Sequence, residues 1–203
     1  MVRVPPPRLL RAPDANSVHL CLDMQRIFGR GGIWETPWME KVLPNIVRIA
    51  TKTAEMTVFT RFVTPRTPDE AEGSWKAYYE KWNAATRAEL PADQLRLMPQ
   101  LEELCPPALV IEKPGYSAFF ETDLRDMLKE RGAQHLIVTG SETDVCVLSS
   151  VLSAIDEGFF VTLIGDAVCS SSDEGHDNLM SIYTRRYSSQ LQVMTTAELI
   201  AVI

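Results

Sequence analysis

Residues 135–158, HLIVTGSETDVCVLSSVLSAIDEG, join two different patterns. The first five residues form a short apolar run typical of a buried strand, and residues 143–157 are predicted to be a helix that Gly158 ends. Hydroxyls, an acid and a thiol lie at the junction, within TGSETDVC. A strand that turns directly into a helix is the repeating unit of an α/β fold. The stretch therefore predicts one strand–helix unit with reactive side chains at its joint.

The same alternation continues along the chain in both directions. Strands are predicted at residues 17–23, 56–63, 108–112, 135–139, 159–165 and 191–194. Helices are predicted at residues 37–54, 74–82 (SWKAYYEKW), 121–131, 143–157 and 173–187, with a final helical turn after TTAEL. This order predicts an α/β fold, a three-layer α-β-α arrangement with a six-stranded, mainly parallel Rossmann-like sheet. Residues 1–16, which include three consecutive prolines, are predicted to be a stiff lead-in to a single domain at residues 17–203.

The composition argues against several classes of protein. The chain has 203 residues, with 20 basic and 27 acidic ones, so its formal net charge is −7. No basic cluster interrupts this balance, and nucleic acid is therefore not expected as a partner. No apolar run is long enough for a membrane span or a signal peptide. The four cysteines show neither a CxxC pair nor zinc-like spacing, which favours free thiols in a reducing, cytoplasmic compartment.

Three side chains stand where predicted strands end. Asp23 ends the first strand, Lys113 follows the third, and Cys146 lies just beyond the fourth. Ligands of open α/β sheets bind outside the carboxyl ends of the strands, so these three side chains are predicted to meet. Each also has a structural interpretation: an acid that caps a turn, a solvated surface amine, and a thiol in the core. Their coincidence at one sheet edge favours the functional interpretation.

The predicted chemistry centres on the thiol. With Thr143 as the helix N-cap, Cys146 would lie near the third helical position, where unpaired amides and the helix dipole favour a thiolate. We expect a lowered thiol pKa, with Lys113 as the neighbouring cation. Asp23 could take the thiol proton and return it to a leaving group. Backbone amides of the same turn could bind a developing oxyanion.

These motifs resemble the isochorismatase-like cysteine hydrolase superfamily, which includes nicotinamidases, N-carbamoylsarcosine amidohydrolases, and biuret and ureidoacrylate hydrolases. The resemblance covers residues 18–199 and rests on LCLDMQRIF, EKPGYSAFFETDL and GSETDVCVLSSVLSAIDEGFFVTLIGDAVCSSS, in that order. It implies a catalytic triad of Asp23, Lys113 and Cys146, with a thioester formed on the thiol. It also implies a cis peptide at Ser141–Glu142 and an oxyanion bound by the amides of Glu142 and Cys146.

One departure from the family pattern concerns metals. Nicotinamidases of the group bind a metal through an Asp and paired His residues after the second strand, but residues 64–82 contain no His. We therefore predict no catalytic metal and no cofactor, and nicotinamide becomes a less expected substrate. True isochorismatases, which cleave a vinyl ether with the Asp and often lack the Cys, are an alternative that Cys146 argues against. A catalytically idle binding protein on the same fold is the third interpretation.

The substrate-binding residues are predicted from the loops after the first three strands. Candidates for contact with a small amide-type substrate are Gln25, Phe28, Arg61, Trp75 and Tyr116. Arg61 could bind a carboxylate or ureido oxygen, or could pair with a nearby Glu. Trp75, Tyr78, Tyr79 and Trp82 have the spacing of one helical face, which fits an aromatic lid, core packing or a subunit contact. The resemblance implies a homo-oligomer, either a dimer or a tetramer.

Overall fold

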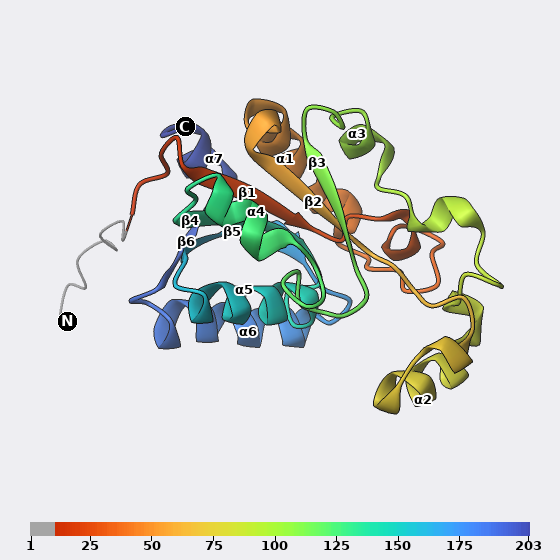
Figure 1. Ribbon diagram of the computed structural model, residues 1–203. Coiled ribbons are helices and arrows are strands. Elements are labelled where there is room, and N and C mark those ends of the chain that lie inside the picture. Colours follow the sequence, from red (N-terminus) through yellow and green to blue (C-terminus); the bar gives the residue numbers. More distant parts are fainter. Residues whose placement is uncertain (1–10) are drawn as a thin grey trace.

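The structure, a computed structural model, describes residues 11–203 and contains one central sheet (Figure 1). Its strands are β1 (Ser17–Leu22), β2 (Thr57–Phe62), β3 (Leu109–Lys113), β4 (His135–Ser141), β5 (Phe160–Cys169) and β6 (Leu191–Met194). The six strands lie in the order β3-β2-β1-β4-β5-β6, and every pair is parallel. The predicted α/β sheet is confirmed, and it is parallel throughout. The order reverses direction between β1 and β4, which is the switch point where such sheets bind ligands.

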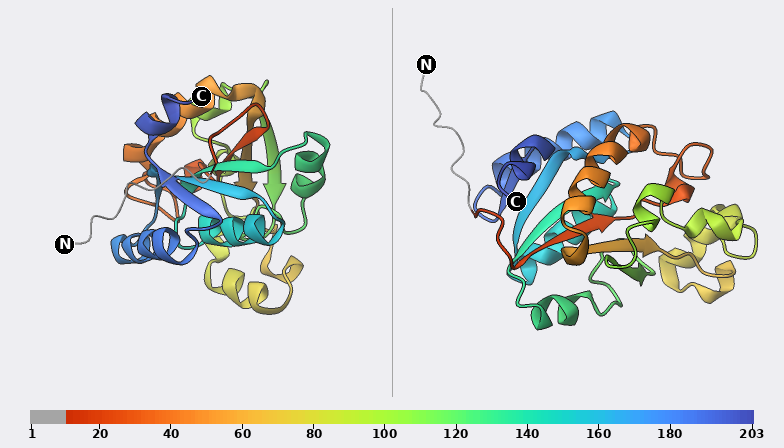
Figure 2. Two further views of the ribbon diagram at one scale, coloured as in Figure 1. Left: turned by 90° about the vertical axis from the view of Figure 1, so that its left-hand side faces the viewer. Right: turned by 90° about the horizontal axis from the view of Figure 1, so that it is seen from above.

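Helices cover both faces of this sheet. They are α1 (Met39–Lys52), α2 (Gly73–Lys81), α3 (Pro99–Glu102), α4 (Leu124–Glu130), α5 (Cys146–Asp156), α6 (Asp173–Arg186) and α7 (Thr196–Ile200). One layer contains α1, α3 and α7, and the other contains α4, α5 and α6, as the end-on view of Figure 2 shows. α2 lies in a segment that projects away from the sheet, at the lower right of Figure 1. Among the described residues, no helix has the length and apolar character needed to cross a membrane.

The two layers have separate hydrophobic cores because side chains alternate between the faces of each strand. On β1, Cys21 packs with the core under α1, whereas Leu20 and Leu22 pack with the core under α5. All six residues of β1 are buried, as expected for a central parallel strand. The ends of β1 are therefore held from both sides, and so is the residue that follows it.

Several predicted boundaries shift by a few residues. β4 continues to Ser141 and β5 to Cys169, beyond the predicted ends at residues 139 and 165. The extension of β4 depends on Gly140, whose φ of +113° and close approach to Leu22 no larger residue could adopt easily. The sequence did not predict the continuation of β5 because Asp166 is polar. In the structure, Asp166 fits in the strand because its Oδ1 accepts hydrogen bonds from the amide and hydroxyl of Thr196. The short helix α3 was not predicted at all.

The predicted lead-in, residues 1–16, is only partly described, because residues 1–10 lie outside the described part. Within the described part, Arg11 donates a hydrogen bond of 3.1 Å to Gln134, and its carbonyl accepts one of 2.7 Å from Gln192. Its guanidinium also lies 5.6 Å from the ring centroid of Phe160. These contacts attach the last part of the lead-in to the sheet. The division into a lead-in and a single domain at residues 17–203 stays a prediction.

Candidate active site

Three strand-end side chains meet at the carboxyl edge of the sheet. The Nζ atom of Lys113 lies 2.7 Å from Oδ2 of Asp23 and 3.5 Å from Sγ of Cys146. Asp23 follows β1, Lys113 ends β3, and Cys146 begins α5. The exposed fractions of these residues are only 0%, 1% and 6%. Three side chains far apart in the sequence thus form one buried cluster with an acid, an amine and a thiol.

The ammonium group of Lys113 is held by several acceptors at once. It donates to the carbonyl oxygens of Gly115 and Tyr116, each at 2.9 Å, in addition to its contacts with Asp23 and Cys146. Burial lowers the pKa of Lys113, but the charge of Asp23 and the contact with Cys146 raise it more, so the net shift of this pKa is upward. Lys113 therefore remains protonated and supplies a fixed positive charge.

Asp23 is positioned by a hydroxyl that sequence reasoning did not identify. Thr60 Oγ1 of β2 donates a 2.5 Å hydrogen bond to Oδ1 of Asp23 and accepts one of 3.1 Å from its amide. Asp23 has a φ of +50°, an uncommon conformation that turns the chain sharply as β1 ends. Thr60 is a buried polar residue on β2, the strand next to β1. A polar residue within an apolar strand run was the sequence feature that could have indicated its role.

The thiol of Cys146 differs from the sequence-based expectation. Burial raises its pKa well above the usual value, the Asp23 carboxylate raises it further, and Lys113 lowers it only in part. The predicted lowering of the thiol pKa is therefore wrong for the resting protein. The predicted N-cap is also wrong, because α5 begins at Cys146 after Val145, and the Thr143 hydroxyl is hydrogen-bonded with Nδ1 of His176 at 2.9 Å.

The turn between β4 and α5, residues 141–146, is fixed by contacts on its outer side. The Ser141–Glu142 peptide bond is cis. The Glu142 carboxylate accepts from the Ser171 amide at 2.8 Å, and Asp144 accepts from the Ser170 hydroxyl at 2.6 Å. Within residues 11–203, the amides of Glu142 and Cys146 donate to no protein acceptor. Two free amides therefore flank the thiol.

An aromatic cluster that includes Trp75 of α2 lies beside Lys113. The Trp75 ring lies 4.8 Å from the Tyr116 ring and 6.1 Å from the Phe62 ring, measured between centroids. The ammonium of Lys113 in turn lies 5.1 Å from the Phe62 centroid. Burial raises the pKa values of Tyr78 and Tyr116, and the nearby Cys146 and Glu142 raise them further. The α2 segment thus packs against Tyr116 and Phe62, next to the ammonium of Lys113.

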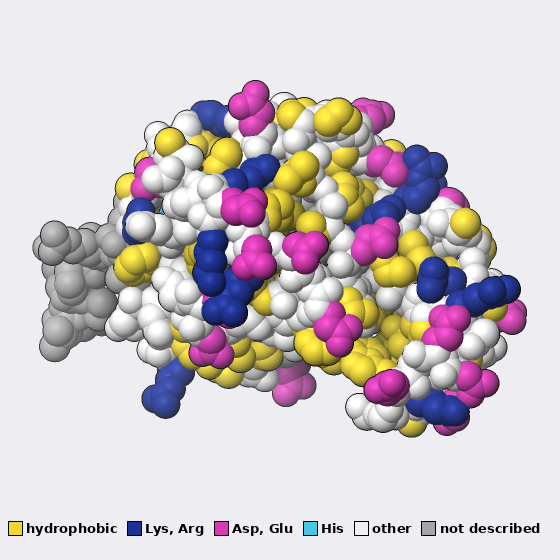
Figure 3. All heavy atoms as spheres, in the orientation of Figure 1, with side chains coloured by type: hydrophobic (Ala, Val, Ile, Leu, Met, Phe, Trp, Pro, Cys, Tyr) yellow, Lys and Arg dark blue, Asp and Glu magenta, His cyan; other side chains and the backbone are white. Residues whose placement is uncertain are grey.

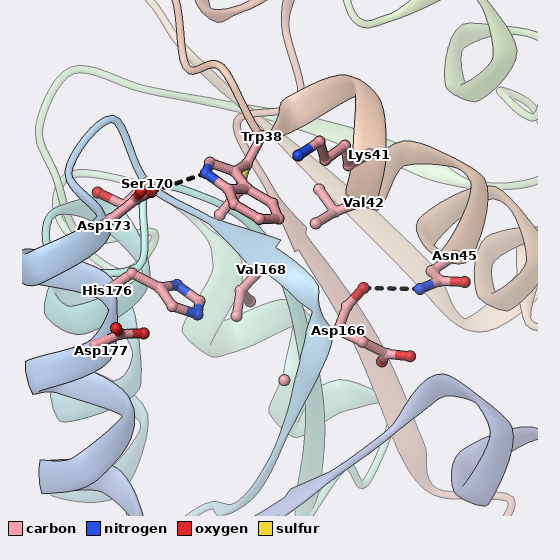
Figure 4. Close-up of a pocket in the computed structure, with 12 residues that line it drawn as sticks. Trp38, Lys41, Val42, Asn45, Asp166, Val168, Ser170, Asp173, His176 and Asp177 are labelled. Carbon is pink, nitrogen blue, oxygen red and sulfur yellow. Dashed lines mark hydrogen bonds between the residues drawn. The ribbon is translucent and has the colours of Figure 1, made fainter.

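Two cavities lie near this edge of the sheet. One, of about 680 Å³, is lined by Lys113 and by residues from the α2 segment. The other, of about 560 Å³, lies between α1, β5 and α6 and contains none of the three cluster residues (Figure 4). Figure 4 shows its two bridging hydrogen bonds, from Trp38 to Asp173 and from Asn45 to the carbonyl of Asp166, both of 2.8 Å.

A family profile described as the Isochorismatase domain matches residues 17–198. The chain belongs to the isochorismatase family. The predicted resemblance is confirmed, because the match covers almost the whole described chain. The family assignment itself names no substrate, since the profile describes a domain.

Comparisons with individual proteins agree with this assignment. The family protein PncA of Bacillus subtilis is 36% identical over 98 residues, which cover 47% of this chain and 54% of that protein. The ureidoacrylate amidohydrolase RutB of Klebsiella pneumoniae is 37% identical over 106 residues, covering 47% and 43%. The chain thus spans about half the length of the curated relatives it matches. A cysteine hydrolase structure from Pseudomonas syringae pv. phaseolicola has a TM-score of 0.78 at 22% identity, covers 96% of both chains, and shares the fold.

The predicted substrate-binding residues divide into two groups. Trp75 and Tyr116 contact each other in the aromatic cluster beside Lys113, and Phe28 is stacked on Trp34 at 5.9 Å. Gln25 was misplaced by the sequence reasoning. The buried side-chain amide of Gln25 donates hydrogen bonds to the carbonyls of Phe62 and Leu95, and it accepts one from the backbone amide of Phe62. Gln25 therefore braces the loop that follows β1. Arg61 forms an ion pair with Glu112 on the neighbouring strand, the alternative that the sequence left open.

The metal site of some family relatives does not fit the residues of this chain. Within residues 11–203, no group of three or more His, Cys, Asp or Glu side chains is arranged to bind a metal ion. In the segment after β2, the Glu70 carboxylate already accepts a 2.7 Å hydrogen bond from the Arg66 amide. Asp69 is paired with Lys76 at 2.8 Å. Freedom from a catalytic metal stays a prediction that needs a chelation experiment.

Proposed function

We propose that the protein is a metal-independent cysteine amidohydrolase that cleaves a small carboxamide, carbamoyl or ureido compound through a thioester on Cys146. The proposal rests on one observation above all: the Lys113 ammonium contacts both the Asp23 carboxylate, at 2.7 Å, and the Cys146 sulfur, at 3.5 Å. An amine that only stabilised the fold would not need a buried thiol as its fourth neighbour. Similarity to a ureidoacrylate amidohydrolase supports the same substrate class.

The raised thiol pKa determines how the nucleophile is formed. At neutral pH the resting thiol keeps its proton, so deprotonation must accompany attack. Asp23 accepts this proton as Sγ forms a bond to the carbonyl carbon of the substrate. Lys113 stays protonated and offsets the negative charge that the cluster carries during the step. The acid is thus a general base, and the amine is an electrostatic partner.

The remaining steps follow from the same groups. The carbonyl electron pair moves onto oxygen, and the free amides of Glu142 and Cys146 are the donors proposed to bind this oxyanion. When the C–N bond breaks, the leaving nitrogen takes the proton from Asp23 and departs as ammonia or an amine. Water then attacks the thioester while Asp23 accepts its proton. The C–S bond breaks, and the proton returns to the thiol, which releases the acid product.

The experiment that tests this proposal is an ammonia-release assay over small amides, ureas and carbamoyl acids. We expect release by the wild-type protein from at least one compound, undiminished by a chelator. Cys146→Ala should reduce this release by several orders of magnitude, because the covalent route is lost. Full turnover by Cys146→Ala would contradict the thioester, and loss of turnover on chelation would contradict the metal-free assignment.

A further inference from the structure

One peptide group of the β4–α5 turn, between Glu142 and Thr143, is linked to both of the free amides. Its carbonyl, on Glu142, accepts hydrogen bonds from the amides of Val145 and Val147, at 3.1 and 3.0 Å. These two amides flank the amide of Cys146, and the amide of Glu142 precedes the carbonyl on the same residue. Because a peptide group is planar and moves as one unit, a rotation of this group would redirect both free amides.

The residue on the other side of this peptide group, Thr143, is bonded to neighbouring elements through all three of its polar groups. Its amide donates to the carbonyl of Cys169 in β5 at 2.8 Å. Its carbonyl accepts a 3.0 Å hydrogen bond from the hydroxyl of Tyr183, and its own hydroxyl is hydrogen-bonded with Nδ1 of His176 at 2.9 Å. Tyr183 and His176 both belong to α6, so this helix holds the turn from its outer side.

The helix α6 is built to make this contact. Its two bonding residues, His176 and Tyr183, are seven positions apart, about two turns, and therefore share one face of the helix. Burial raises the pKa of Tyr183 and the nearby Asp144 raises it further, so the phenol keeps the proton that it donates. A Cβ atom added to Gly175 would overlap with the carboxylate of Asp144, so the first turn of α6 packs directly against the turn.

These α6 residues lie apart from the groups expected to touch a substrate. They are outside the Asp23–Lys113–Cys146 cluster, and α6 is well separated from the α2 segment in Figure 1. The hydrophobic side chains that gather between the body and the α2 segment in Figure 3 are therefore remote from α6. An effect of an α6 side chain on the reaction must then pass through the turn.

We propose that His176 and Tyr183 are positioning residues, which act through Thr143 to aim the amides of Glu142 and Cys146 at the oxyanion. The assignment rests on the proposed function and extends it to a helix that does not contact the substrate. The oxyanion develops only as the thiol attacks, so its hydrogen bonds are made in the transition state and not with the bound substrate. Loss of this positioning should therefore lower kcat and leave KM almost unchanged.

The kinetic test uses variants that remove one hydrogen bond each. Tyr183→Phe and His176→Leu should lower kcat for a hydrolysed amide by about tenfold, with KM changed by less than about twofold. His176→Asn should restore most of the loss, because its side-chain amide can bond from the position of Nδ1. Tyr187→Phe, which removes a phenol hydroxyl at the end of α6, is the control and should keep the full kcat. Unchanged kcat in both test variants, or an equal loss in the control, would overturn the proposal.

A double-mutant cycle shows whether His176 acts through Thr143. Thr143→Val and His176→Leu break the same hydrogen bond, so the double variant should be slower than Thr143→Val alone by no more than about twofold. The control cycle uses Thr184→Val, because the Thr184 hydroxyl bonds only within α6, to the carbonyls of Met180 and Ser181. There the loss caused by His176→Leu should stay at about tenfold. Losses that multiply in the cycle with Thr143 would contradict the proposed route.

Hydrogen exchange of the turn tests the anchor without any need for turnover. Amides in residues 141–148 should exchange faster, by about tenfold or more, in Tyr183→Phe and His176→Leu than in the wild-type protein. They should be unchanged in Tyr187→Phe. Peptides from β1 should exchange at the wild-type rate in every variant, because only the turn is released. Unchanged exchange in the turn, or an equal acceleration in β1, would overturn the proposal.

These measurements separate two kinds of failure. A turn that loosens in the α6 variants of a protein that hydrolyses no amide would retain the anchor and remove the proposed function. A wild-type protein that releases ammonia, with α6 variants that keep the full kcat, would retain the proposed function and remove the positioning role.

Discussion

The thiol of Cys146 is subject to opposing influences within one hydrogen-bonded cluster. Burial and the Asp23 carboxylate raise its pKa, and the Lys113 ammonium lowers it. The sequence placed all three residues at one sheet edge, because Asp23 follows β1, Lys113 ends β3 and Cys146 begins α5. It could not predict the sign of the pKa shift, since that depends on how deeply the thiol is buried. A helix start alone was therefore a poor guide to thiol reactivity.

Substitution of the charged neighbours should move the thiol pKa in opposite directions. Asp23→Asn removes a negative charge and should shift the pH profile of Cys146 alkylation to lower pH, even though hydrolysis is lost. Lys113→Met removes the cation and should shift the profile to higher pH. The measurement is the rate of alkylation of Cys146 by iodoacetamide between pH 6 and about 11, a range that includes the ordinary thiol pKa.

The control for this experiment is Asp126→Asn, an exposed acid on α4 that should leave the profile unchanged. A shift of the Asp23→Asn profile to higher pH would mean that the carboxylate does not repel the thiolate. In that case the general-base role of Asp23 would lose its electrostatic basis.

At the scale of elements, the end of β4 depends on how closely it approaches β1. A Cβ atom added to Gly140 would lie 2.1 Å from the carbonyl oxygen of Leu22, the residue before Asp23. The φ of Gly140, +113°, is also strongly unfavourable for other residues. The two strand ends that carry Asp23 and the β4–α5 turn are thus held together by a residue without a side chain.

Gly140→Ala should therefore destabilise the protein by about 3 kcal/mol or more, because backbone atoms must move. Gly31→Ala is the matched control: its φ is +76°, but no atom lies within 4 Å of its added Cβ. We expect a cost of only about 1 kcal/mol there. Urea unfolding measures both. Equal costs for the two variants would contradict the close packing of β1 against β4.

Two buried histidines connect neighbouring strands of the sheet. His19 of β1 is hydrogen-bonded with Thr57 at 3.1 Å and Thr139 at 2.9 Å. His135 of β4 is hydrogen-bonded with Ser17 at 3.0 Å and Thr162 at 2.7 Å. Burial lowers the pKa of His19 to about 3 and that of His135 to about 4. Both imidazoles are therefore neutral in the folded protein at moderately acidic pH.

Acid should destabilise the protein through these residues. Below pH about 6.5 the unfolded chain protonates both imidazoles, whereas the folded chain does not, so the unfolded state binds more protons. Stability then falls by up to about 1.4 kcal/mol per pH unit for each histidine as the pH drops from 6.5 toward 4. His19→Gln and His135→Gln should each reduce this slope by about one proton, as measured by urea unfolding between pH 4.5 and 7. An unchanged slope in both variants would contradict the assignment.

The elements were predictable to different degrees. All six strands were predicted because each contains a short apolar run, which in the central strand β1 is buried throughout and in the edge strand β3 is mostly exposed. The short helix Pro99–Glu102 was missed because four residues carry too little periodicity. The loops expected to bind substrate were predicted least well. Gln25 has the polarity of a ligand-binding residue, and only the structure shows that its side-chain amide is already engaged in three hydrogen bonds to the backbone.

For the whole molecule, the order of the strands explains why the site lies where it does. β1 and β4 are adjacent at the sheet centre, and the chain leaves them on opposite faces, so Asp23 and the β4–α5 turn border one crevice. Lys113 reaches this crevice from the edge strand β3 with its long side chain. An α/β fold thus unites residues separated by 123 positions, from Asp23 to Cys146.

The quaternary structure remains a prediction at this scale. We expect a dimer or a tetramer, so sedimentation equilibrium should give a mass about two or four times the 22.8 kDa of the chain. Exposed apolar residues on β3, Leu109 and Val110, each 38% exposed, offer a surface that another subunit could cover. Val110→Lys should then lower the measured mass, whereas a mass of one chain for the wild-type protein would contradict the prediction.

The central claim is that Cys146 forms a covalent bond with the acyl part of an amide. Mass spectrometry of the protein, quenched with acid during turnover of a hydrolysed amide, tests it most directly. We predict an added acyl mass on the peptide that contains Cys146, removed by neutral hydroxylamine and absent from Cys146→Ala. Sustained hydrolysis with no such adduct, surviving in Cys146→Ala but lost in Asp23→Asn, would contradict the claim and point to acid chemistry at Asp23 instead.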